Sequence, residues 1–173
     1  MKTRPSEEAS MQVDVTAASR GDAAVLANLF QYYAYDMTEI VDIAVDPDGR
    51  FVVPSLDAYW SDSWRHPYIV RAAGNLAGFA LLQKRSRITG DENTWDVAEF
   101  FVMRKYRRRG VGEAVAARLF DAFRGRWEVR QMRANHAAIA FWRRVISTYT
   151  QGHFSEELYD DHRWRGPVQS FEN

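Results

Sequence analysis

The sequence predicts an α/β (α+β) fold. Three observations support this class: short stretches in which apolar and polar residues alternate, longer stretches with apolar residues at helical spacing, and glycine or proline turns between them. Their order is strand, helix, loops, three strands, helix, strand, helix and a final strand pair. No repeat, low-complexity tract or linker divides the chain, so we expect one domain over residues 11–173, preceded by a loosely packed tail, residues 1–10.

The first half of the chain begins with a predicted strand over residues 11–16, in which Val13 and Val15 share one face. The segment Ser19-Arg-Gly-Asp22 resembles a capping box, which predicts that a helix follows. That helix carries an apolar stripe formed by Val25, Leu26, Leu29, Phe30 and Tyr33. Proline and glycine then break residues 34–66 into loops, with a short helix at about residues 56–61.

The second half of the chain begins with a predicted β-hairpin, whose strands span residues 68–73 and 76–84 around the turn at Gly74-Asn75. Another strand is expected over residues 95–103. The later elements are, in order, a helix over 110–123, a strand over 127–132, a helix over 135–146, and a final strand pair over 148–154 and 162–171.

The composition excludes several classes of function. The chain has 23 basic and 23 acidic residues, and this zero net charge argues against a general nucleic-acid binder. It has no cysteine, which excludes disulfides and a cysteine nucleophile, and its four histidines lack metal-ligand spacing, so we expect no metal site. No apolar run approaches the ~20 residues that span a bilayer, and the first ten residues lack the apolar region of a secretory signal. We expect a cytoplasmic protein without membrane or nucleic-acid partners.

A glycine turn between a strand and a helix is the most informative motif. It reads Arg107-x-x-Gly110-x-Gly112, after the strand that ends near Val102. Such a turn presents several backbone N–H groups at a helix N-terminus, where they bind phosphate, and glycine removes side chains that would block the approach. It is neither a Walker A loop nor a dinucleotide fingerprint, because no Gly-Lys-Ser/Thr follows and Val115 replaces the third glycine. The expected phosphate-binding residues are Arg107, Arg108, Arg109, Gly110, Val111 and Gly112. The alternative is that residues 104–109 form a basic turn that is solvated or binds nucleic acid. This interpretation does not explain the glycines.

These residues resemble the GNAT superfamily of acyl-CoA-dependent N-acetyltransferases. That family carries Gln/Arg-x-x-Gly-x-Gly/Ala between a central strand and a helix, and then an Asn followed by Ala three residues later and Tyr seven residues later. Here the second motif reads Asn135, Ala138 and Trp142, so the tyrosine position departs from the family pattern. The resemblance implies a mixed, mostly antiparallel central sheet with helices on both faces, and acetyl-CoA as cofactor. Asn135 has an alternative reading as a helix N-cap, and Ala138 and Trp142 have one as core residues.

The resemblance also implies a reaction, the direct transfer of an acetyl group to the primary amine of a small molecule or protein. Backbone groups of Phe101 and Val102 would pair with the pantetheine arm of the cofactor, and a strand N–H near Val102 would hold the thioester oxygen. Glu99 lies where several family members place the base that accepts the amine proton. The alternative is that Glu99 pairs with an arginine.

Trp142 stands where the family usually places the tyrosine that protonates the leaving thiolate. Indole cannot act as a useful acid, so the proton would come from Tyr149 or Tyr106, or the thiolate, with a pKa of ~8.5 as the thiol, would leave unprotonated. This departure keeps open an alternative function, a non-catalytic module that binds or senses acyl-CoA.

The acceptor site is predicted between residues 32 and 64, where acidic and aromatic residues gather. We expect Tyr33, Asp36 and Trp60 to contact the acceptor, and this composition suits a cationic amine. The alternative is a solvated acidic loop over aromatic core residues. The acids are Asp36, Glu39, Asp42, Asp46, Asp48, Asp57 and Asp62, and the aromatic residues are Tyr32, Tyr33, Tyr35, Tyr59, Trp60 and Trp64. The sequence does not identify the acceptor, and it leaves open whether the protein forms a homodimer.

Overall fold

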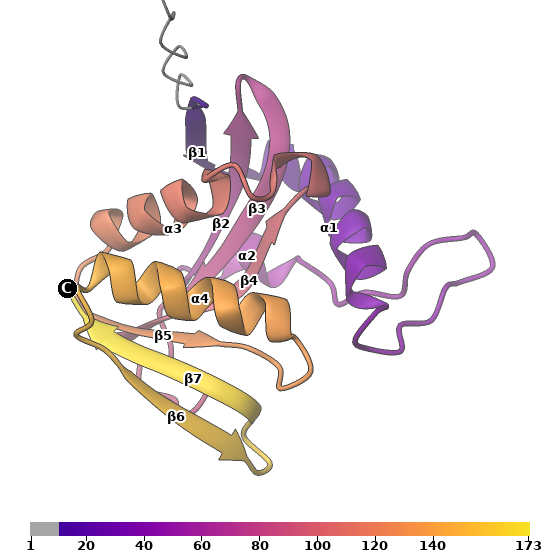
Figure 1. Cartoon of the computed structure of the whole chain (residues 1–173). Coiled ribbons are helices and arrows are strands. Elements are labelled where there is room, and N and C mark those ends of the chain that lie inside the picture. Colours follow the sequence, from indigo (N-terminus) through magenta and orange to yellow (C-terminus); the bar gives the residue numbers. More distant parts are fainter. Residues whose placement is uncertain (1–10) are drawn as a thin grey trace, which may run out of the picture.

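A seven-stranded sheet with the strand order β1-β2-β3-β4-β5-β7-β6 forms the centre of the molecule (Figure 1). The computed structural model describes residues 11–173, so the predicted tail, residues 1–10, lies outside the described residues. The strands are β1 (Val13–Ala17), β2 (Arg65–Ala72), β3 (Asn75–Gln83), β4 (Thr94–Val102), β5 (Arg126–Arg130), β6 (Ser155–Asp160) and β7 (Arg165–Glu172). The helices are α1 (Ala23–Met37), α2 (Ala58–Ser61), α3 (Val111–Ala122) and α4 (His136–Tyr149).

The sheet is mixed and mostly antiparallel, as expected, because β4 and β5 form its one parallel pair within residues 11–173. A parallel pair needs a crossover, which α3 supplies. The two strands pair only where Thr94–Val97 meet Arg126–Val129. Beyond Val97, β4 continues to Val102 beside β3, without a partner strand on its other edge in the described chain. The sheet therefore opens between the second half of β4 and the end of β5.

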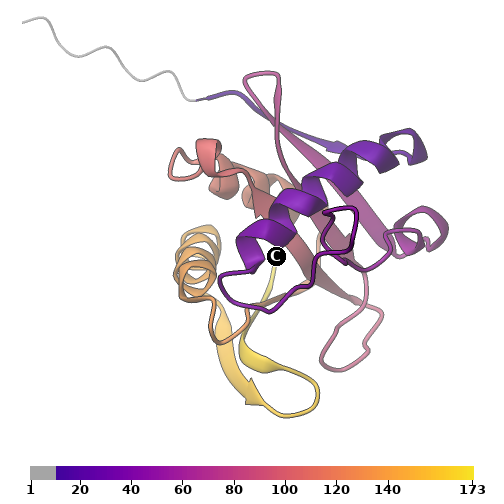
Figure 2. The ribbon, with the colours of Figure 1, turned by 90° about the vertical axis from the view of Figure 1, so that its right-hand side faces the viewer.

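Helices cover both faces of the sheet, which confirms the predicted α/β class. Helix α1 crosses one face (Figure 2), where its apolar stripe packs on residues of β2, β3 and β4. Helices α3 and α4 cover the other face and bury a larger cluster. At the centre of that cluster lies Trp127 of β5, with no exposed surface and with rings of Phe120 and Phe171 at 4.9 and 6.3 Å.

The predicted strand over residues 148–154 is wrong. Helix α4 continues to Tyr149, whose ring packs against Phe120 and Phe171 at 5.1 and 6.1 Å. The helix ends where Gln151 and Gly152 take positive φ angles of 54° and 86°, and β6 begins only at Ser155. The packing of one aromatic ring thus outweighs the β-propensity of the Thr-Tyr-Thr segment. No helix within residues 11–173 is long and apolar enough to cross a membrane.

Replacing Trp127 by alanine tests the central packing. Trp127→Ala removes a fully buried indole and leaves a cavity, so we expect the free energy of unfolding to fall by about 3–5 kcal/mol. Urea unfolding followed by circular dichroism measures this change. The control is Tyr32→Ala on α1, where the side chain is 58% exposed, and the expected change is within about 0.5 kcal/mol. Equal losses in the two variants would contradict the assignment of Trp127 to the centre of the core.

Candidate active site

The open edge of β4 carries backbone groups that face away from β3. The N–H of Met103 donates to the carbonyl of Ala77 at 2.8 Å, and Phe101 lies opposite Phe79. In an antiparallel ladder the direction of the backbone groups alternates, so those of Phe101 and Met103 face β3, whereas those of Phe100 and Val102 face the open edge. Of the two residues expected to pair with the cofactor, Phe101 faces β3, whereas Val102 faces the open edge together with Phe100.

The glycine turn follows this strand and leads into α3. Gly110 is the N-cap residue with φ of 77°, a left-handed conformation that favours glycine, and the first helical N–H bond runs from Ala114 to the Gly110 carbonyl at 3.0 Å. The six backbone N–H groups of residues 108–113 donate to no acceptor within the described chain. Residues 107–110 are exposed. The turn therefore presents a set of free donors at a helix N-terminus, the arrangement that binds phosphate.

The arginines of the turn divide into two groups. Arg107 donates from Nε to the Val102 carbonyl at 2.6 Å and pairs through Nη2 with Asp36 of α1. Arg104 also pairs with Asp36, at 2.8 Å. Arg108 and Arg109 are exposed and make no ion pair with any residue of the described chain. Arg107 thus joins the turn to α1, whereas Arg108 and Arg109 are available to an anion. Asp36, predicted to contact the acceptor, instead neutralises arginines at the turn.

The N-terminus of α4 faces the open edge of β4. The Oδ1 atom of Asn135 accepts the N–H of Ala138 at 3.0 Å, so Asn135 is the N-cap. Trp142 follows one turn after Ala138, is 5% exposed, and packs against Phe100 with ring centroids 4.9 Å apart. A Cβ atom at Gly112 would lie 3.0 Å from the ring of Phe141, so glycine permits the close approach of α3 and α4.

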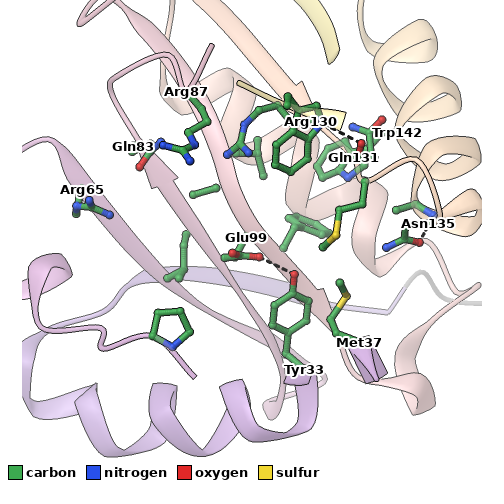
Figure 3. A pocket seen from close by; sticks show the side chains of 18 of the residues that line it. Tyr33, Met37, Arg65, Gln83, Arg87, Glu99, Arg130, Gln131, Asn135 and Trp142 are labelled. Atoms are coloured by element: carbon green, nitrogen blue, oxygen red, sulfur yellow. Dashed lines mark hydrogen bonds between the residues drawn. The ribbon is translucent and has the colours of Figure 1, made fainter. Parts of the chain in front are cut away.

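Two cavities meet at this edge. The turn cavity, of about 800 Å³, is lined by the glycine turn, the end of β4 and the first turns of α4. The inner cavity, of about 1320 Å³, extends from the same edge toward α2, the β3–β4 loop and the start of β7 (Figure 3). Both are lined by Tyr33, Met37, Ile40, Phe100, Asn135, Ala138 and Trp142. They are therefore two parts of one continuous groove.

Glu99 of β4 lies in the inner cavity. Its Oε2 atom accepts a hydrogen bond from the hydroxyl of Tyr33 at 2.5 Å (Figure 3), and no arginine pairs with it in the described chain. Burial raises the pKa of the Glu99 carboxyl above its ordinary value, more than the Tyr33 hydrogen bond lowers it. Burial, together with the negative charge of Glu99, also raises the pKa of the Tyr33 hydroxyl. The pair is thus a carboxyl with a raised pKa, held by a hydroxyl that stays protonated.

A buried ion pair supports the inner cavity at the point where β4 and β5 diverge. Asp96 is fully buried and accepts hydrogen bonds from Nε and Nη2 of Arg130, both at 2.8 Å, and from Gln83 at 2.9 Å. The guanidinium of Arg130 lies 4.6 Å from the ring centroid of Trp164. Its Nη1 atom has no hydrogen-bond partner in the described chain, and Arg130 is one of the residues that line the cavity.

Two further residues that were predicted for the site lie outside both cavities. Trp60 lines neither cavity and packs against the core cluster beneath α1. The hydroxyl of Tyr149 donates to Asp121 at 2.8 Å, at the far end of α4 from Asn135, and Tyr149 lines neither cavity. The prediction of Tyr149 as a proton donor therefore disagrees with the geometry. Sequence reasoning missed Arg130 and Gln83 altogether, because only the pairing of β3, β4 and β5 brings them beside Glu99.

Comparison with known families gives one clear match. The model of the acetyltransferase (GNAT) family matches residues 50–146, more than half of the chain. Curated protein sequences give no match. Among solved structures, an acetyltransferase from Thermus thermophilus is similar, with a TM-score of 0.66 at 15% identity over 95% of this chain and 99% of that chain.

Two other similar structures contain coenzyme A. A spermidine N-acetyltransferase from Vibrio cholerae, in complex with CoA and spermine, has a TM-score of 0.58 at 15% identity over 93% of this chain and 95% of that chain. The PaiA N-acetyltransferase from Thermoplasma acidophilum, in complex with coenzyme A, has a TM-score of 0.58 at 12% identity over 94% and 100%. At these identities the likeness establishes a common fold.

The pH dependence of stability tests the environment of Glu99. The carboxyl has a pKa above 4.5 in the folded protein, so the folded state binds more protons than the unfolded state between pH 4.5 and that raised pKa. This contribution to stability is complete below pH 4.5 and is lost as the pH rises through the folded pKa. In Glu99→Gln we expect this part of the decline to be absent, so that the variant gains stability relative to the wild type as pH rises. Urea unfolding from pH 4 to 8 measures the difference, with exposed Glu172→Gln as control; parallel curves for Glu99→Gln and wild type would contradict the assignment.

Proposed function

Because this chain belongs to the acetyltransferase (GNAT) family, we propose that it transfers an acetyl group from acetyl-CoA to the primary amine of a small molecule or protein. One observation carries the proposal. The free N–H groups of residues 108–113 open into a groove that follows the unpaired edge of β4 to the carboxyl of Glu99. A diphosphate bound at the turn would thus direct the rest of a long cofactor toward a proton acceptor.

The residues of the groove fit acetyl-CoA. The free amides of the turn, with Arg108 and Arg109, suit its phosphates. The outward backbone groups of Phe100 and the N–H of Val102, whose carbonyl already accepts Arg107, suit the amides of its pantetheine arm. The side chains of Asn135, Ala138 and Trp142 form the opposite wall of the groove. When bound, acetyl-CoA supplies an acetyl group activated as a thioester.

Glu99 accepts the proton of the incoming amine in this proposal. An alkylammonium has a pKa of ~10.4, so it must lose a proton before its nitrogen can act as a nucleophile at neutral pH. Tyr33 holds Oε2 of Glu99, and Oε1 makes no hydrogen bond within the described chain. Because Glu99 lines the groove, this second oxygen is available to the amine.

Trp142 leaves the chain without an acid at the position where the family usually has tyrosine. Its indole N–H donates a hydrogen bond but does not release a proton. A thiol has a pKa of ~8.5, so the leaving thiolate needs little more than a hydrogen-bond donor near neutral pH. The same substitution favours the second candidate function, an acyl-CoA-binding module without catalysis. Calorimetric binding of acetyl-CoA with release of free CoA in the presence of amines supports the enzyme, and binding without release supports the module.

Replacing Gly110 by glutamate tests the phosphate site. Gly110→Glu adds a side chain and a negative charge at the turn, so we expect the affinity for acetyl-CoA to fall at least about 100-fold by calorimetry. Gly49→Glu is the matched control. Both glycines have φ near 78°, and a Cβ meets no atom within 4 Å at either, so backbone strain is the same in the two variants. Equal affinity in the two variants would contradict the phosphate site.

Replacing Glu99 by glutamine tests the proton acceptor. We expect Glu99→Gln to lower kcat about 100-fold near pH 7, since general-base catalysis is typically of that size, while the affinity for acetyl-CoA stays within about twofold. The loss should shrink as the pH approaches the amine pKa of ~10.4, because the free amine then becomes abundant. Initial rates of CoA release from pH 6 to 10 measure this profile. A uniform loss at every pH would instead indicate a structural role.

A further inference from the structure

The inner cavity is strongly basic. Six arginines line it, against a single carboxylate, Glu99, among the lining residues. The arginines are Arg65, Arg85, Arg87, Arg130, Arg133 and Arg165. They come from β2, the β3–β4 loop, β5, the loop before α4 and the start of β7, so their convergence is a property of the fold and not of one sequence segment.

Two of these arginines have no acidic partner within residues 11–173. Arg87 in the β3–β4 loop and Arg165 at the start of β7 are exposed and form no ion pair there. Figure 3 shows Arg87 and Gln83 among the side chains that line this cavity. The other four are paired, Arg65 with Asp62 at 3.1 Å, Arg85 with Glu92 at 4.0 Å, Arg130 with Asp96 at 2.8 Å and Arg133 with Asp160 at 3.2 Å.

Two of the aromatic residues expected near the acceptor, Tyr59 and Trp64, already have one of the protein's own cations over the ring. The guanidinium of Arg65 lies 4.2 Å from the ring centroid of Trp64 and 5.1 Å from that of Tyr59. Trp164 has Arg130 in the same relation, at 4.6 Å. A bound polyamine would have to displace these contacts.

The predicted acidic residues also lie outside the inner cavity. None of the seven acids between residues 36 and 62 lines it, and Asp36 is committed to Arg104 and Arg107. The inner cavity therefore offers a cationic acceptor no carboxylate other than Glu99 among its lining residues.

We infer that the acceptor is an amine that also carries an anionic group, a carboxylate or a phosphate. This inference rests on the proposed function and specifies its substrate class. Arg87 and Arg165 bind the anionic group, because guanidinium donors match both oxyanions in geometry and charge, and the amine of the same molecule reaches Glu99 deeper in the cavity. The arginine-rich lining also raises the local concentration of anionic acceptors.

Pairs of acceptors that differ only in the anion test the inference. With acetyl-CoA fixed, CoA release is measured for 4-aminobutyrate against butylamine, phosphoethanolamine against ethanolamine, and spermidine. We expect kcat/KM to be at least roughly tenfold higher for the anionic member of at least one pair, and the preferred pair distinguishes carboxylate from phosphate. A preference for spermidine or for the neutral-tailed amines would overturn the inference while leaving the proposed function intact.

A double variant identifies the residues. Arg87→Gln with Arg165→Gln should raise KM for the preferred anionic acceptor roughly tenfold and leave butylamine kinetics unchanged. Arg118→Gln, exposed on α3 and outside both cavities, is the matched control. An unchanged preference in the double variant would overturn the assignment of these two arginines.

Binding measured without acetyl-CoA separates this inference from the proposed function. Calorimetric titration of 4-aminobutyrate and phosphoethanolamine should show binding of one of them to the wild-type protein and weaker binding to the double variant. Absence of binding to the wild type would overturn the inference. Failure of the protein to bind acetyl-CoA would overturn the proposed function, whatever the acceptor titration shows.

Discussion

The buried ion pair between Asp96 and Arg130 stands at the division of the sheet, and the groove depends on it. Asp96 lies in the paired half of β4, while Arg130 is the last residue of β5, just beyond the paired part. Their two hydrogen bonds hold the end of β5 against β4 where the backbone ladder stops. Removing one partner of such a pair leaves an uncompensated buried charge, which is far more costly than the pair itself is stabilising. The pair also fixes Arg130 near Glu99, so one interaction lies where the sheet divides and places a cation at the base of the groove.

The formal net charge of zero conceals a separation of charge in space. The acids of the segment between α1 and β2 remain in exposed turns or pair locally; Asp46, for example, accepts hydrogen bonds from nearby backbone N–H groups. Asp36 neutralises Arg104 and Arg107, and Glu113 pairs with Arg144, which leaves Arg108 as the arginine of the turn cavity without an ion pair in the described chain. The arginines that line the inner cavity come from other segments. The net charge argues against a general nucleic-acid binder. It does not predict the separation of charge, because that separation depends on which segments the sheet brings together.

Local sequence patterns predicted those elements of the fold whose conformation depends on residues close together in the sequence. The stripe of α1, the hairpin of β2 and β3, and the glycine turn before α3 follow from periodicity and from the conformation of glycine. The hairpin turn lies one residue earlier than expected, at Ala73-Gly74, because Asn75 already pairs with Ala72. The family resemblance supplied the mixed sheet. The acceptor side was not predictable in this way: Asp36 and Trp60 have the right residue types but contact arginines and core side chains. The hydrogen bond between Tyr33 and Glu99 joins residues 66 positions apart in the sequence, and no spacing rule finds such a contact.

Trp142 bears differently on the two proton transfers of the proposed reaction, the one from the amine and the one to the leaving thiolate. It forms part of the wall of both cavities and packs against Phe100 and Phe141, so its ring is a fixed surface at the junction. Since indole provides no proton, the acid–base groups of the proposed reaction lie on the amine side, where Tyr33 holds Glu99. That asymmetry is chemically consistent: an alkylammonium with a pKa of ~10.4 requires a base at neutral pH, whereas a thiolate whose thiol has a pKa of ~8.5 is an adequate leaving group without an acid. Tryptophan in place of the family's usual tyrosine thus removes the proton donor for the leaving thiolate, and thiolate departure needs proton transfer less than the amine does.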